Sequence, residues 1–107
     1  MLKGLGDIGN LMRLQKDMKG AQKRIMGATR EGTSPNGMVK AVMNGEYRLM
    51  GISIDPDYLK GVLPRDLEAM IVAATNDAVD QIKEFYVSEM QKLTGGLDIP
   101  GLGAFLK

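Results

Sequence analysis

The chain has 107 residues, of which 44% are hydrophobic and 25% charged, and its formal net charge is +1. This length predicts one small domain over residues 1–107 with a modest core, so oligomerisation is an expected source of further burial. The sequence contains no Cys and no His. That composition excludes disulfides, thiol catalysis and thiolate metal sites, and it removes the most versatile acid–base residue.

No apolar run approaches the ~18 residues that a membrane span requires. We also find no signal-peptide pattern, so we expect a cytosolic protein with no membrane partner. The charge is unevenly distributed: residues 1–30 hold seven Lys/Arg and two acids, net +5, whereas residues 31–107 have net −4. This asymmetry predicts an anionic partner for the basic part, with a solvated helix face as the competing interpretation.

The first predicted element is an amphipathic helix over residues 11–28. Residues 1–10 are rich in Gly and are expected to form a flexible N-terminus, with Asn10 as the helix cap. Apolar residues then recur every seven positions, which favours a helix packed on a sheet or on a partner helix. The stripe consists of Leu11, Leu14, Met18, Ala21, Ile25 and Ala28. The basic residues avoid this stripe and are Arg13, Lys16, Lys19, Lys23, Arg24 and Arg30.

A three-stranded antiparallel meander is predicted next. Alternation of Thr29, Glu31 and Thr33 allows a short edge strand, and residues 34–37, Ser-Pro-Asn-Gly, form a predicted turn. Asn44-Gly45 predicts a type I′ hairpin turn, which requires positive φ at both residues. Period-two alternation in the two hairpin strands predicts two sets of buried side chains. They are Val39, Ala41 and Met43 before the turn, and Met50, Ile52 and Ile54 after it.

A second long helix is predicted from Pro64 to about Leu93. A connector over residues 57–63 precedes it, and Pro at the first helical position has the backbone angle that a helix requires. Gly95-Gly96 are expected to end the helix, leaving a flexible tail over residues 95–107. The predicted fold class is therefore α+β, with an N-terminal helix, a three-stranded antiparallel sheet and a long C-terminal helix.

Candidate catalytic groups are sparse. Asp55 with Asp57, and Asp77 with Asp80, could form carboxylate pairs, but Asp is common in turns and on solvated helix faces. No Ser has a His to activate it. We therefore expect no enzyme activity, no cofactor, no metal site and no small-molecule substrate.

Three stretches of this sequence resemble the YbaB/EbfC family of small bacterial nucleoid-associated proteins. They are G-M-V-K-A-V-M-N-G-E-Y-R-L-M-G-I-S-I-D-P at residues 37–56, D-L-E-A-M-I-V-A-A-T-N-D-A at 66–78, and G-G-L-D-I-P-G-L at 95–102. The resemblance covers nearly the whole chain. It implies a tweezer-like α/β homodimer that binds double-stranded DNA with little sequence dependence, in the cytoplasm at the nucleoid, with roles in nucleoid organisation and gene regulation.

In this family DNA contacts are attributed to the projecting helices, so the matching candidates here are the six basic residues named above. The second helix carries more acids than bases. The alternative function is a protein-binding scaffold or assembly adaptor that uses the Met-rich first helix and the apolar tail without binding DNA.

Overall fold

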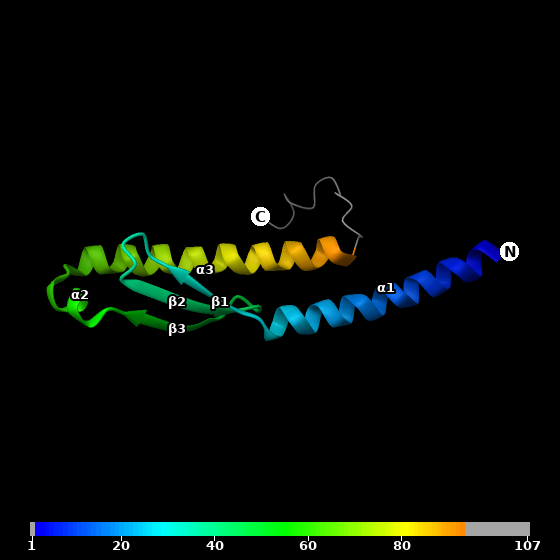
Figure 1. Ribbon diagram of the computed structural model, residues 1–107, viewed down its shortest axis with the longest axis horizontal. Coiled ribbons are helices and arrows are strands. Elements are labelled where there is room, and N and C mark those ends of the chain that lie inside the picture. The colour runs from blue at the N-terminus through cyan, green and yellow to red at the C-terminus, as the bar shows by residue number, and fades with distance from the viewer. Residues whose placement is uncertain (1, 94–107) are drawn as a thin grey trace.

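The computed structural model describes the backbone of residues 2–93 and the side chains of residues 11–93. The predicted α+β order is confirmed, and the predicted flexible tail lies outside the described residues. Figure 1 shows the elements, which are α1 (Leu2–Gly27), β1 (Thr29–Thr33), β2 (Val39–Asn44), β3 (Leu49–Ile54), α2 (Pro56–Gly61) and α3 (Pro64–Leu93).

The three strands form the predicted antiparallel meander in the order β1-β2-β3. Gly32 of β1 is opposite Ala41 of β2, and Ala41 is opposite Ile52 of β3. The predicted turn before β2 is also confirmed, because the Gly37 amide donates to the Ser34 carbonyl at 2.9 Å. Gly37 has a φ of 74°, a left-handed backbone conformation that Gly adopts at no steric cost.

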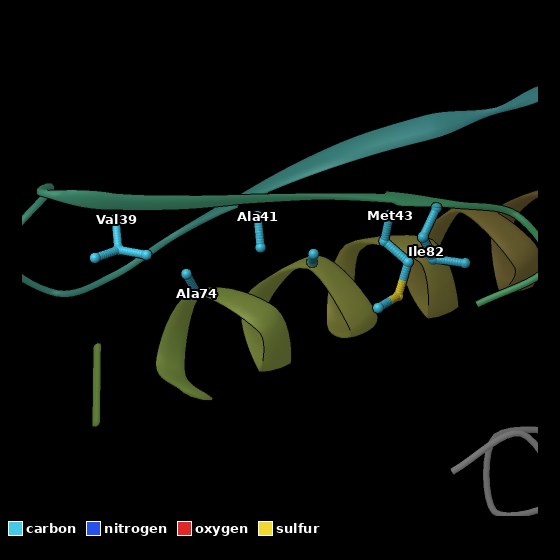
Figure 2. Close-up of a cluster of buried hydrophobic side chains, with 6 residues drawn as sticks. Val39, Ala41, Met43, Ala74 and Ile82 are labelled. Carbon is cyan, nitrogen blue, oxygen red and sulfur yellow. The ribbon is translucent and has the colours of Figure 1, made fainter. Parts of the chain in front are cut away.

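The core lies between one face of the sheet and α3. Figure 2 shows Val39, Ala41 and Met43 pointing from β2 toward the helix that carries Ala74 and Ile82. All five side chains are buried, as the alternation in β2 predicts. Small residues bring the two layers close together: a Cβ atom added at Gly32 would collide with the backbone of α3 at Ala74 and Ala78.

The prediction that Met50, Ile52 and Ile54 form a buried set is wrong for β3. A register irregularity near Met43 pairs that residue with Leu49, which breaks the alternation at Met50. Met50 is 62% exposed and Ile52 36% exposed, and Ile54 is only partly buried. The physical reason is coverage, because α3 packs on β1 and β2 and leaves β3 uncovered except at Ile54, which packs against the core.

The prediction of a type I′ turn at Asn44-Gly45 is also wrong. The hairpin loop is longer: the Asn44 amide donates to the Arg48 carbonyl at 2.9 Å, and the left-handed residue is Tyr47, with φ 61°. The Asn44 side-chain oxygen accepts bonds from the amides of Glu46 and Arg48. This is the arrangement of a three-residue hairpin loop, in which a turn is followed by one left-handed residue.

The first helix begins at Leu2, so the predicted helix start at Leu11, with Asn10 as the cap, is wrong. Figure 1 shows α1 extending away from the sheet and past the end of α3, which makes the molecule 73 Å long but only 25 and 15 Å in its other dimensions. Ala21 and Ile25 are buried, whereas Leu11 is 59% and Met18 42% exposed. The apolar stripe of α1 is therefore covered only near its C-terminal end.

Candidate nucleic-acid interface

The basic side of α1 is a solvent-exposed row of cations on the projecting helix. Arg13, Lys16, Lys19 and Lys23 are all exposed. Their separations of three and four residues place successive members on one side of the helix. This row lies on the side of α1 opposite the buried Ala21 and Ile25, so binding an anion there requires no change in packing. The structure thus brings four of the six predicted site residues together on one surface.

Arg24 differs from these four because it contacts α3. Its Nε and Nη2 atoms both donate to Oε2 of Glu89, at 3.1 and 2.9 Å. The Arg24 side chain is still 55% exposed, whereas that of Glu89 is only 2% exposed. The pair therefore joins a surface cation to a buried carboxylate and connects the two long helices.

Glu89 has a second cation close to its other carboxylate oxygen. The Lys92 ammonium is 3.6 Å from Oε1, one helical turn along α3. The hydrogen bonds from Arg24 hold the pKa of Glu89 below its ordinary value, against the opposing effect of burial. The same bonds to Glu89 raise the pKa of Arg24. Glu89 is consequently ionised at neutral pH, and Arg24 stays charged.

A groove of about 340 Å³ separates this part of α1 from the end of α3. It is lined by Lys16, Asp17, Gly20, Arg24, Lys92 and Leu93. Three of the lining side chains are cations, so the groove presents positive charge from two helices. Sequence reasoning missed Lys92, because it belongs to a helix with more acids than bases and only the folded chain brings it beside α1.

Arg30 lies on β1 rather than on the projecting helix. Its guanidinium carbon is 4.4 Å from the centroid of the Phe85 ring of α3, and Nη1 donates to the Thr29 carbonyl at 2.8 Å. The ring face attracts the cation and holds it against the body of the protein. Arg30 is thus separate from the row on α1.

Two of the carboxylates considered as catalytic candidates, Asp55 and Asp77, have structural contacts. Asp55 caps α2 by accepting bonds from the amides of Asp57 and Tyr58, both at 3.0 Å. Asp77 accepts a bond from the Thr33 amide at 2.9 Å. Among the side chains of residues 11–93, no group of three from His, Cys, Asp or Glu is placed to hold a metal ion. None of the helices described within residues 2–93 combines the length and apolar character needed to cross a membrane.

A family model and several relatives match most of this chain. The model of the YbaB/EbfC DNA-binding family matches residues 3–97. A nucleoid-associated protein of Caldanaerobacter subterraneus subsp. tengcongensis is 42% identical over 95 residues, which cover 89% of this chain and 86% of the relative. A nucleoid-associated protein of Afipia carboxidovorans is 38% identical over 99 residues, covering 92% and 94% of the two chains.

The fold also has a solved counterpart. The crystal structure of an uncharacterized protein from Helicobacter pylori matches with a TM-score of 0.67 and 20% identity, covering 89% of this chain and 98% of that one. This likeness concerns the fold alone. The match to the family model spans most of the sequence, including both long helices and the sheet. The chain therefore belongs to the YbaB/EbfC DNA-binding family.

Proposed function

We propose that this protein is a nucleoid-associated protein that binds double-stranded DNA as a homodimer with little sequence specificity. Its family and the names of its relatives support DNA as the partner. The observation that carries the proposal is the exposed row of Arg13, Lys16, Lys19 and Lys23 on a helix that projects from the body. These relatives also support a location at the nucleoid of a bacterial cytoplasm.

DNA binding by this surface is electrostatic. Lys and Arg side chains neutralise phosphates and release condensed counterions, so affinity falls steeply as salt rises. Phosphate contacts position a protein on the duplex and carry no direct sequence information. Arg24 and Lys92 add cations at the groove between α1 and α3, whereas Arg30 contributes from the body. Weak sequence preference follows from this set, because every proposed contact is made by a Lys or Arg side chain to phosphate.

The second copy in the proposed homodimer covers β3. The outer edge of β1 is closed by α3, since Asp77 accepts from the Thr33 amide and Gln81 Nε2 donates to the Glu31 carbonyl at 2.7 Å. Among the residues that the structure describes, none gives the edge of β3 such cover, and the Met50 and Ile52 side chains are exposed. An exposed apolar edge strand tends to pair with another chain. A symmetric dimer buries that edge and doubles the number of basic helices.

An electrophoretic mobility-shift titration tests this function. The full chain is titrated against three duplexes of unrelated sequence at 50 and 200 mM salt. Two copies of the four-residue row offer up to about eight phosphate contacts, so affinity should fall by on the order of 10³- to 10⁵-fold between these salt concentrations. The three duplexes should give similar affinities. Absence of binding at 50 mM salt would favour the protein-binding scaffold instead.

We also propose that the protein is not an enzyme. The family is a DNA-binding one, and the full sequence contains neither His nor Cys. General acid–base catalysis and activated nucleophiles most often depend on these residues. Incubation of supercoiled plasmid with the protein and Mg²⁺ should leave the DNA topology unchanged, whereas nicking or relaxation would contradict this proposal.

A further inference from the structure

Glu89 occupies a position where packing alone would favour an apolar side chain. The buried residues of α3 are Ala74, Ala78, Ile82 and Glu89. Among the side chains of residues 11–93, Glu89 is the one charged group that is buried. Burying a carboxylate costs free energy unless it is paired and hydrogen-bonded. The burial of this carboxylate on the core-facing side of α3 therefore indicates that Glu89 has a role other than packing.

The contacts of Glu89 join α3 to the part of α1 that is buried, where the other buried side chains are apolar. From α1, the buried residues are Ala21 and Ile25, and Gly20 precedes them. Contacts between apolar side chains are non-directional, so they do not by themselves fix the orientation of one helix against another. The bonds from Arg24 are directional, and buried polar pairs between helices are known to select one register among several. The Arg24–Glu89 pair supplies the directional contact that the apolar contact lacks.

We propose that Glu89 is a positioning residue. It sets the orientation of the α1 arm, the part of α1 that precedes Arg24, relative to α3. It also holds Arg24 and Lys92 at the groove between the two helices. The first part rests on these contacts alone, and the effect on DNA rests on the proposed function. Because the arm projects beyond the contact with α3, a small rotation at that contact moves the far part of the helix by a larger distance. Arg13 lies about 16 Å along α1 from Arg24, so a tilt of about 15° would move it by roughly 4 Å. Such a movement is enough to break a hydrogen-bonded phosphate contact.

Distance measurements between two spin labels test the first part directly. The sequence has no native Cys, so Gln15→Cys on the arm and Asn76→Cys on the body of α3 provide unique labelling sites at exposed positions. Labelled protein is mixed with excess unlabelled protein, so that each dimer carries at most one labelled protomer. The variants are Glu89→Leu, which removes the pair, and Glu89→Gln, which keeps an acceptor oxygen. The control is Glu84→Leu, an exposed position on the same helix with the same change in charge.

We expect one narrow distance distribution for the parent and for Glu84→Leu, a broadened or shifted one for Glu89→Leu, and an intermediate one for Glu89→Gln. Glu89→Leu should still fold, because it leaves the half-exposed Arg24 free to be hydrated rather than buried without a partner. Circular dichroism checks this for each variant. A distribution for Glu89→Leu that coincides with that of the parent would overturn the proposal. If that variant does not fold, an unchanged distribution for Glu89→Gln would overturn it.

Measurements of DNA affinity distinguish the positioning role of Glu89 from an effect of net charge alone. Both Leu variants raise the net charge by one, so an effect of charge alone predicts slightly tighter binding for both. Positioning predicts that Glu89→Leu binds roughly tenfold more weakly at 0.1 M salt, as loss of one phosphate contact implies, while Glu84→Leu does not weaken. Equal affinities for the two variants would contradict the effect on DNA. If the parent itself does not bind DNA, the proposed function fails. The distances between the two spin labels still test the positioning role in that case.

Discussion

At the scale of single residues, Gly45 is required for a close contact between the hairpin and α1. A Cβ atom added there would collide with the carbonyl of Ile25, near the end of α1. The Asn-Gly pair correctly predicts where the chain reverses, but not the reason for the glycine. Turn statistics describe local backbone angles, whereas this glycine is needed for a contact between segments that are 20 positions apart in the sequence.

Gly45→Ala should therefore destabilise the protein even though Gly45 does not have a positive φ. The expected loss is about 1–3 kcal/mol, the usual cost of forcing extra volume into a packed site. Urea denaturation measures it, with Gly51→Ala as the control because a Cβ atom at Gly51 meets nothing within 4 Å. If the two variants unfold at the same urea concentration, the contact with Ile25 does not restrict residue 45.

The ion pair at Glu89 predicts a dependence of stability on pH. Its pKa is lowered in the folded protein, so the stabilisation is present above the ordinary Glu value of about 4.3 and is lost as pH falls through the lower folded value. The charged groups facing it are Arg24 on α1 and Lys92 on α3, and Asp17 acts on Arg24. Thermal unfolding should show that Glu89→Gln is less stable than the parent at pH 7 and that this difference is smaller at pH 3. A difference that is the same at both pH values would contradict the pairing.

At the scale of elements, α3 holds the outer edge of β1 through polar side chains. Asp77→Ala removes the acceptor for the Thr33 amide and should cost about 1 kcal/mol. Asp80→Ala on the exposed side of the same helix is the matched control, because helix propensity changes equally in both. Amide hydrogen exchange should show faster exchange at Thr33 in the Asp77 variant only. Unchanged protection of that amide would mean that the bond does not hold the strand.

The bounds of the elements were largely predictable, but their packing was not. Pro64 correctly predicts the start of α3, and the alternation of Val39, Ala41 and Met43 correctly predicts the buried side of β2. The same alternation fails in β3 because local patterns do not state how far α3 extends across the sheet. Gly-rich composition over residues 1–10 likewise predicts that the helix starts only at Leu11, whereas α1 begins at Leu2. The low helix propensity of individual Gly residues is a weak guide to where a 26-residue helix begins.

At the scale of the whole molecule, the uncovered β3 predicts self-association. Ile52→Lys places a charge in the proposed dimer interface and should give a monomer of 11.6 kDa by sedimentation equilibrium, where the parent should give about twice that mass. Thr29→Lys, on an exposed position of β1, is the control and should remain dimeric. A parent that sediments as a monomer at micromolar concentration would contradict the dimer. Dimeric Ile52→Lys would place the interface elsewhere.

The candidate site was predictable only in part, for a reason that also lies at this scale. Helical spacing is sufficient to group Arg13, Lys16, Lys19 and Lys23 on one side of α1. It cannot show that Arg24 pairs with Glu89, 65 positions away, or that Lys92 joins the groove. These contacts depend on how α1 lies on α3, which no local pattern in either helix specifies.

The most direct test of DNA binding by the basic side of α1 compares two charge-matched triple variants. The first variant changes Lys16, Lys19 and Lys23 to Gln. The second variant changes Lys40, Arg48 and Lys60, which are exposed on the body of the protein, to Gln. The measurement is the slope of log affinity against log salt for one duplex. Each lost phosphate contact should reduce this slope by roughly 1, so the α1 variant should lose far more slope and affinity than the body variant. Equal losses in the two variants, or full binding by the α1 variant, would contradict the placement of the DNA site on α1.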